Sequence, residues 1–434
     1  MKRDLKAILV VMIVLSTTVI NGQTEVKKDV ETKNGEKKDL VFKGAEGFGV
    51  YTPAGRGGRI IKVSNLNGEG PGSLKEALEA KGPRIVVFEV AGVIDLNKVP
   101  LKISEPFLTI AGQTAPSPGI TIIKDGIQIY SHDVLIQHIR FRPGDAGQPK
   151  KSGFEPDCST SGPDAYNIVI DHCSFSWAVD ENISVSGPRY DGPEGTSRNV
   201  TISNCIVAEG LCNATHLKGL HSMGTLIHDN CTNVAVIKNL YSQNNQRNPF
   251  FKAFTTGVIV NNVVFNPGKF GIEVDYVKKE WNDTGITPEN ARVSVVGNWT
   301  QHGVNSREGL AILGPLGDAY MEDNVGWDLV GNPLPQTYGE VNILNEKPSW
   351  PEHLNVLPSD KVVDYVLINA GARPKDRDDV DKRIISDFIN RKSRFIDSQE
   401  DVGGYPKVKM VVRKLSVPKK NIDAWLEGFT KQVE

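Results

Sequence analysis

The sequence is poor in cysteine. Its five cysteines are irregularly spaced and none belongs to a Cys-x-x-Cys pair. They are Cys158, Cys173, Cys205, Cys212 and Cys231. This number and spacing argue against a disulfide-rich scaffold and give no support to a zinc site.

The sequence also lacks an excess of basic residues. Its formal net charge is −2, from 50 Lys and Arg against 52 Asp and Glu, and no basic run occurs in it. The charge pattern gives no support to nucleic-acid binding. It leaves room for a locally basic cleft that binds an acidic polymer.

Long hydrophobic runs are missing after the N-terminus. Residues 7–20 are apolar and follow the basic residues Lys2, Arg3 and Lys6. This pattern is typical of an export signal, and its apolar part is too short for a comfortable membrane span of about 20 residues. We therefore predict a signal peptide at 1–22, a flexible segment at 23–40, and a secreted or periplasmic protein without membrane contact after cleavage. An uncleaved membrane anchor is the alternative.

One short phrase recurs from about residue 133 onwards. Each copy is rich in β-branched residues, alternates in polarity and ends at a polar Asn or His. The six end positions, which we call anchors, are separated by 34, 32, 35, 23 and 36 residues, without a helical pattern between them. The anchors are His138, His172, Asn204, Asn239, Asn262 and Asn298.

A strand phrase that recurs at this spacing predicts the coils of a parallel β-solenoid. Aligned copies stack about 4.8 Å apart, their aliphatic residues fill the core, and the anchors meet at one turn. The unequal spacing predicts loops of different length on one side, which in solenoids is commonly the binding face. The alternative is a β-sandwich, but its strands recur at about 8–12 residues.

The C-terminal third of the chain has a different pattern. Segments 378–391 and 420–432 have helical periodicity, while 333–358 is rich in proline and irregular. We therefore predict an all-β solenoid at 41–330 and an extension at 331–434 that wraps or caps it, because open coil ends must be covered.

Five motifs, in order along the chain, resemble the pectate lyases of polysaccharide lyase family one. They are 44–49 (GAEGFG), 55–58 (GRGG), 70–75 (GPGSLK), 108–113 (LTIAGQ) and 169–177 (VIDHCSFSW). The resemblance implies a right-handed parallel β-helix in which 41–330 is the catalytic domain. It also implies a monomeric enzyme that uses calcium to cleave polygalacturonate by β-elimination.

The resemblance implies a calcium site made of carboxylates. β-Elimination removes the C5 proton of a uronate beside a negative carboxylate, so the catalyst must neutralise that carboxylate and supply a base. Asp157 and Asp180 match acidic positions of the family, as does Glu155. Ser184 stands where the family has another acidic residue. Glu181 or Asn182 would compensate, although the side chain of Glu181 is expected to point to the opposite strand face. The alternative is that these are solvated loop acids.

The resemblance also assigns the base and the substrate contacts. The segment 245–252 (NQRNPFFK) resembles a family pattern in which Arg247 takes the C5 proton, although arginine is normally charged. Lys252 stands at the second arginine position of this pattern, and Lys218 resembles the substrate-binding lysine of the family. The alternative for all three is an ordinary solvated charge.

His172 is assigned to the structure instead of to catalysis. It occupies an anchor position like that of Asn204, so we expect it to hydrogen-bond within the ladder. Cys173 and Cys205 share one register and should stack as buried thiols.

Three other functions are compatible with a solenoid of this kind. A pectin lyase would act on methyl-esterified polymer without calcium, and the loss of an acid at Ser184 keeps this alternative open. A hydrolase needs close carboxylates as acid and base, yet the only adjacent Asp pair, Asp378-Asp379, lies in the tail. A non-catalytic polysaccharide-binding protein or adhesin would have no use for Arg247 beside a calcium site.

Overall fold

The computed structural model describes residues 39–392 and 394–434. Residues 40–434 form one compact unit. The predicted signal peptide at 1–22 and all but the end of the segment 23–40 lie outside the described residues. Among the residues that are described, no helix combines the length and the apolar character needed to cross a membrane.

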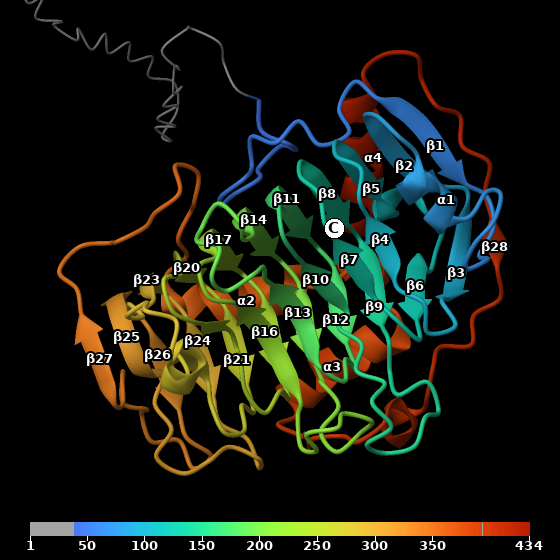
Figure 1. Cartoon of the computed structure of the whole chain (residues 1–434). Helices are drawn as coiled ribbons and strands as arrows, with labels where there is room; N and C mark the ends of the chain where they lie inside the picture. The colour runs from blue at the N-terminus through green and yellow to red at the C-terminus, as the bar shows by residue number, and fades with distance from the viewer. Residues whose placement is uncertain (1–38, 393) are drawn as a thin grey trace, which may run out of the picture. The chain divides into compact units, whose positions relative to one another are not determined.

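Three ladders of parallel strands wind around a common core (Figure 1). From β2 to β25, each coil contributes one strand to the first ladder, one to the second and one to the third before the chain returns to the first. Neighbouring strands within each ladder pair in parallel, from the first coil to the last.

The strands of each ladder are short and evenly stacked. The first ladder contains β1 (Arg59–Val63), β2 (Arg84–Phe88), β5 (Leu108–Ala111), β8 (Val134–Gln137), β11 (Tyr166–Asp171), β14 (Arg198–Ser203), β17 (Thr232–Ile237), β20 (Thr256–Val260), β23 (Arg292–Val296), β25 (Leu313–Glu322) and β27 (Glu340–Ile343). The second contains β3 (Val90–Asp95), β6 (Ile120–Ile123), β9 (Ile139–Arg142), β12 (Ser174–Ser176), β15 (Ile206–Ala208), β18 (Leu240–Ser242), β21 (Val263–Phe265), β24 (Trp299–Gln301) and β26 (Val325–Trp327). The third contains β4 (Leu101–Ile103), β7 (Ile127–Ile129), β10 (Ser159–Ser161), β13 (Glu181–Val185), β16 (Met223–Ile227), β19 (Phe250–Phe251) and β22 (Ile272–Val274), and ends in the first half of β25.

The six predicted repeat strands are consecutive neighbours in the first ladder. They are β8, β11, β14, β17, β20 and β23, paired in parallel in this order. The predicted parallel solenoid is therefore confirmed. The ladder begins earlier than the recognisable phrase, at β1, and continues to β27.

The register corrects the predicted alignment of the anchors. Ser203 pairs with Ile237, so Asn239 lies opposite Cys205 and not opposite Asn204. The backbone N–H of Cys205 accordingly donates to Oδ1 of Asn239 at 2.8 Å. The anchors thus divide between two adjacent levels, one with His138, His172 and Asn204 and the other with Asn239, Asn262 and Asn298.

The second of these levels is a ladder of buried asparagines. After the first asparagine, each side-chain oxygen accepts two hydrogen bonds, one from the backbone N–H and one from the side-chain amide of the asparagine one coil earlier, at 2.9–3.0 Å. The ladder runs through Asn239, Asn262, Asn298 and Asn324, all of them buried. Because the alternative is an unpaired buried amide, this ladder fixes the register of the coils.

The cysteines and His172 behave as predicted. The backbone N–H of Cys173 donates to the sulfur of Cys205 at 3.4 Å, and both side chains are buried. His172 stacks on His138, with ring centroids 5.4 Å apart, and its Nδ1 hydrogen-bonds Asp171 at 2.8 Å. His172 therefore belongs to the turn between the first and second ladders.

Helices cover one end of the stack and one of its sides. α1 (Leu74–Glu79) begins at Ser73, whose hydroxyl accepts from the N–H of Glu76, and buries its apolar face in the core. α2 (Ser359–Asn369) and α3 (Asp379–Ile389) pack on the second ladder, where Val362, Val366, Ile384 and Phe388 contact Ile206, Leu240, Val263 and Phe265. Short 3-10 helices lie at η1 (Gly112–Thr114), η2 (Lys278–Trp281), η3 (Pro374–Asp376) and η4 (Gln399–Val402).

The last part of the chain returns to the first coils. β28 (Val411–Val412) pairs antiparallel with β3, and α4 (Ile422–Val433) packs Trp425, Leu426 and Phe429 against Ile85, Val87 and Ala111. α3 and α4 occupy the two segments for which the sequence predicts helices, whereas α2 was not predicted.

Replacement of Asn298 by alanine should destabilise the stack strongly. The change removes the acceptor of two hydrogen bonds from Asn262 and the donors to Asn324 and to the carbonyl of Ile259. We expect the free energy of unfolding to fall by about 2–4 kcal/mol, measured by urea denaturation. Asn282→Ala, at an exposed position, is the control, and an equal loss in both variants would contradict the role of the asparagine ladder.

Candidate active site

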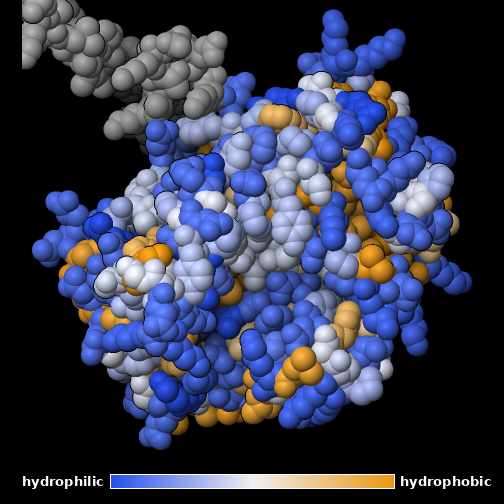
Figure 2. Space-filling model, viewed as in Figure 1, coloured by the Kyte–Doolittle hydropathy of each residue, from blue (hydrophilic) through white to orange (hydrophobic). Residues whose placement is uncertain are grey.

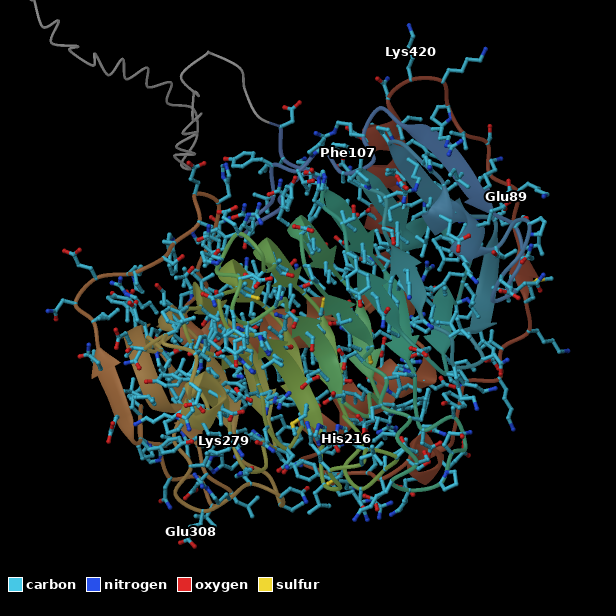
Figure 3. All side chains as sticks on the ribbon, viewed as in Figure 1. Glu89, Phe107, His216, Lys279, Glu308 and Lys420 are labelled. Atoms are coloured by element: carbon cyan, nitrogen blue, oxygen red, sulfur yellow. The ribbon has the colours of Figure 1, made fainter. Side chains whose placement is uncertain are left out.

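The predicted site residues gather at the turns that lead from the second ladder to the third. Asp157 precedes β10, Asp180 and Glu181 lie at the start of β13, and Arg247 precedes β19. Because these strands stack in parallel, their turns follow one another along the coils. Figure 3 shows His216, from the turn before β16, in the lower part of the molecule, where Figure 2 shows hydrophilic residues with some hydrophobic ones among them.

Three carboxylates form the centre of the site. One oxygen each of Asp157, Asp180 and Glu181 lies within 4.8 Å of the other two. Burial and the charge of Asp180 raise the pKa of Asp157 well above its ordinary value. A cluster of carboxylate oxygens whose like charges oppose one another has the chemistry of a site for a hard cation such as calcium.

The position of Glu181 corrects the sequence analysis. Its carboxylate lies on the same side as Ser184, whose hydroxyl donates to Oε2 of Glu181 at 3.3 Å, and not on the opposite strand face. The strict alternation of faces fails at the start of β13, because two consecutive side chains face inward, and Ile183 lies in the hydrophobic core. Asn182 points inward to donate to Oδ1 of Asn244 at 3.1 Å. Glu181 is thereby left to face the cluster.

Two histidines that the sequence analysis missed hold Asp180 in place. Nε2 of His221 donates to Oδ1 of Asp180 at 2.8 Å, and the ring of His216 stacks on that of His221 with centroids 3.7 Å apart. Burial would raise the pKa of Asp180, but this hydrogen bond and the nearby positive charges lower it. The sequence signal that could have revealed these two histidines is their position on either side of Lys218.

Glu155 is not part of the carboxylate cluster. Its Oε1 accepts from the backbone N–H of Leu217 at 2.7 Å and lies 3.4 Å from Nδ1 of His216. Glu155 thus anchors the loop that carries Lys218. The backbone N–H of Lys218 donates to Nδ1 of His216 at 3.0 Å, and its side chain is exposed.

Arg247 reaches the cluster from two coils away. Its guanidinium forms an ion pair with Glu181, and its backbone has a left-handed conformation with φ of 64°. Its backbone N–H donates to Oε2 of Glu273 at 2.6 Å, which fixes the turn. Burial lowers the pKa of Arg247, although Glu273, Asp180 and Asp157 oppose this shift.

Lys252 is buried in an ion-pair network of its own. Its ammonium lies 2.9 Å from Asp229 and 2.7 Å from Glu280, and Arg189 contacts the same two carboxylates at 2.9 Å each. The structure therefore places Lys252 beside two acids and does not bring it to the carboxylate cluster as a free charge.

Comparison with known proteins adds a second line of evidence. The sequence matches no family model. The probable pectate lyase C of Aspergillus flavus is 33% identical over 377 residues, which cover 84% of this chain and 81% of that protein. The probable pectate lyase C of Emericella nidulans is 32% identical over 375 residues, covering 84% and 80%.

Solved structures share the fold at low sequence identity. Jun a 1, the major allergen from cedar pollen, has a TM-score of 0.55 and 16% identity, covering 75% of this chain and 92% of that one. A pectate lyase bound to a hexasaccharide has a TM-score of 0.53 and 14% identity, covering 77% and 98%.

The right-handed parallel β-helix and its fungal relatives make this protein a polysaccharide lyase. More specifically, the chain belongs to polysaccharide lyase family one, the family of the pectate lyases. The resemblance seen in the sequence motifs is thus confirmed.

Glu273 should make the stability of the protein depend on pH. Burial raises its pKa from 4.5 to about 7. The protonated form is therefore favoured in the folded state, and this stabilisation is complete below pH 4.5 and lost as the pH rises through about 7. The free energy of unfolding of the parent should therefore fall by a value on the order of 3 kcal/mol between these limits. In Glu273→Gln this fall should be absent, as measured by urea denaturation at several pH values.

The control for this experiment is Glu308→Gln, since Glu308 is exposed. Its stability should follow the parent at every pH. If Glu273→Gln also keeps the pH dependence of the parent, the carboxyl of Glu273 is not the group responsible.

Proposed function

We propose that this chain cleaves polygalacturonate by calcium-assisted β-elimination and releases 4,5-unsaturated oligogalacturonates. The observation that carries the proposal is the contact between Arg247 and a cluster of three carboxylates, at one stacked turn of the coils. This arrangement joins a candidate base to a candidate cation site.

Asp157, Asp180 and Glu181 are the residues that we propose to hold calcium. They offer the oxygen ligands that calcium prefers, and Ser184 supplies a neighbouring hydroxyl. When bound, calcium would supply positive charge that offsets the substrate carboxylate. Glu155 is better explained as an anchor of the 216–221 loop, because its carboxylate accepts from Leu217.

Arg247 is the residue that we propose to take the C5 proton. Burial lowers its pKa, which makes the neutral form of the guanidine more accessible than in water. Glu273 holds the Arg247 turn through the backbone N–H, so the side chain remains free to move. To act as a base, Arg247 must leave Glu181, and a cation that binds Glu181 would compete with this ion pair.

Lys218 is the better candidate for a substrate contact among the two predicted lysines. It is exposed on the loop that Glu155 and the two histidines hold above the cluster. Lys252 would reach a substrate only by leaving Asp229 and Glu280. We therefore assign Lys252 a supporting role for the surrounding turns.

A calcium-independent pectin lyase is the second candidate. A methyl-esterified substrate has no carboxylate charge to neutralise, so this function would not require three acids at one turn. We further propose that the chain acts as a monomer after export, because the proposed site is made from residues of one chain.

Replacement of Arg247 by lysine should abolish most of the activity. Lysine keeps a positive charge but places its proton-accepting nitrogen differently. We expect turnover on polygalacturonate to fall by about 10²- to 10⁴-fold, with substrate affinity nearly unchanged. The measurement is the ultraviolet absorbance of unsaturated uronates, and Arg292→Lys, at an exposed position on β23, is the control. Near-normal turnover of Arg247→Lys would refute its role as the base.

Replacement of Asp180 by asparagine should act through calcium. The amide keeps an oxygen that accepts from His221 but loses the negative charge. We expect the calcium concentration for half-maximal activity to rise at least about tenfold, with activity recovered at high calcium. Asp379→Asn changes an exposed carboxylate of the tail and serves as the control. Activity of the parent in the presence of chelator would instead favour the pectin lyase.

A further inference from the structure

A second group of cations lies further along the edge that carries Arg247. The guanidinium of Arg307 lies over the ring of Phe270 at 5.5 Å and over the ring of Tyr338 at 5.7 Å. The ammonium of Lys269 lies over the same Phe270 ring at 5.0 Å. We call Lys269, Phe270, Arg307 and Tyr338 the aromatic–cation platform.

The backbone places the platform in line with Arg247. Asn245, two residues before Arg247, accepts from the backbone N–H of Lys269 at 2.7 Å. The N–H of Arg307 donates to the carbonyl of Gly268 at 2.9 Å, so its turn follows that of Lys269. Arg247, Lys269 and Arg307 thus precede β19, β22 and β25, the successive strands of the third ladder. With a coil spacing of about 4.8 Å, Arg307 is about 10 Å of stack beyond Arg247.

A glycine makes room for one wall of the platform. Gly314 lies opposite Glu273 in the register of β22 and β25. A Cβ atom at Gly314 would lie 2.4 Å from Cε1 of Tyr338. The absence of a side chain therefore lets the Tyr338 ring lie against the outer face of the sheet, beside the turn that carries Arg307.

The two cations of the platform have no acidic partner in the structure. Lys269 and Arg307 are exposed and form no ion pair with any carboxylate among residues 39–392 and 394–434. Glu308 follows Arg307 but projects outward at the lower edge of the coils (Figure 3). This differs from Lys252 and Arg189, whose charges are neutralised by Asp229 and Glu280.

The hydroxyl of Tyr338 interacts with the side chain of Arg307. Its oxygen is buried and forms no hydrogen bond of good geometry with the described residues. A guanidinium held between two rings keeps its planar fork in a restricted orientation, which suits recognition of a carboxylate. The rings themselves offer apolar surface for the face of a sugar.

We propose that the aromatic–cation platform binds a uronate residue of the polymer beyond those held at Arg247. Its carboxylate contacts Arg307 and Lys269, and its ring lies against Phe270 or Tyr338. The proposal rests on the proposed function, since it takes an anionic polysaccharide as the ligand. It makes Arg307 a determinant of affinity for long chains and leaves proton abstraction to Arg247.

Kinetics on substrates of two lengths tests the platform. In Arg307→Ala, KM for polygalacturonate should rise about five- to tenfold, as expected for the loss of a charge-assisted contact. Turnover at saturation should change less than about twofold, since the contact is the same in the ground and transition states. On digalacturonate, whose two residues lie on either side of the bond cleaved at Arg247 and leave none for the platform, the two proteins should have similar kcat/KM.

Two further variants separate charge from folding. Arg307→Lys keeps the charge without the planar fork and should recover part of the affinity, including its sensitivity to salt. Arg391→Ala removes an exposed arginine that also lies over aromatic rings, those of Phe265, Trp299 and Phe388, on the side covered by α3. This control should bind polygalacturonate like the parent.

Binding can be measured apart from catalysis by retardation of the protein in native gels that contain polygalacturonate. Reduced retardation of Arg307→Ala, with parent-like retardation of Arg391→Ala, supports the platform even if the parent shows no lyase activity, in which case the proposed function alone fails. Equal retardation of Arg307→Ala and the parent overturns the platform. An equal loss of kcat/KM on digalacturonate and on the polymer also overturns it.

Discussion

Parallel pairing between successive coils determines where each functional side chain lies. A residue is placed by its partner one coil away, at a spacing of about 4.8 Å, and the buried asparagines allow only one register. Residues from separate parts of the sequence, such as Asp157, Glu181 and Arg247, therefore meet at one edge. The site requires no dedicated domain, because each coil contributes one turn to it.

The same stacking concentrates charge, and the site depends on how that charge is balanced. Asp180 is held by His221, Glu181 pairs with Arg247, and the burial of Asp157 raises its pKa. Acids close to one another are costly without a cation, so the arrangement supports the proposed cation site. Lys252 is the contrasting case of a structural charge in the same fold, because its ammonium is neutralised by Asp229 and Glu280.

The sequence predicted the solenoid well because each coil repeats one local pattern of alternating, β-branched residues. It predicted the register less well, since Asn204 and Asn239 are both amides yet lie on adjacent levels. Glu181 was misjudged because alternation fails where Asn182 and Ile183 both face the interior. The partners of Lys252 and Asp180 are set by loops whose paths leave no periodic signal, so only the structure revealed them.

The return of α4 to the first coils changes how the chain can reach its final form. A simple solenoid grows by local addition, because each coil needs only its neighbour. Here Ile85, Val87 and Ala111 are covered by Trp425, Leu426 and Phe429, which lie after every coil in the sequence. During synthesis, this apolar surface of the earliest coils remains exposed to water until α4 has left the ribosome. The packing of α4 on the first coils is thus a late step of folding. A chain that stops before α4 would keep its stack but leave this apolar surface open to other proteins.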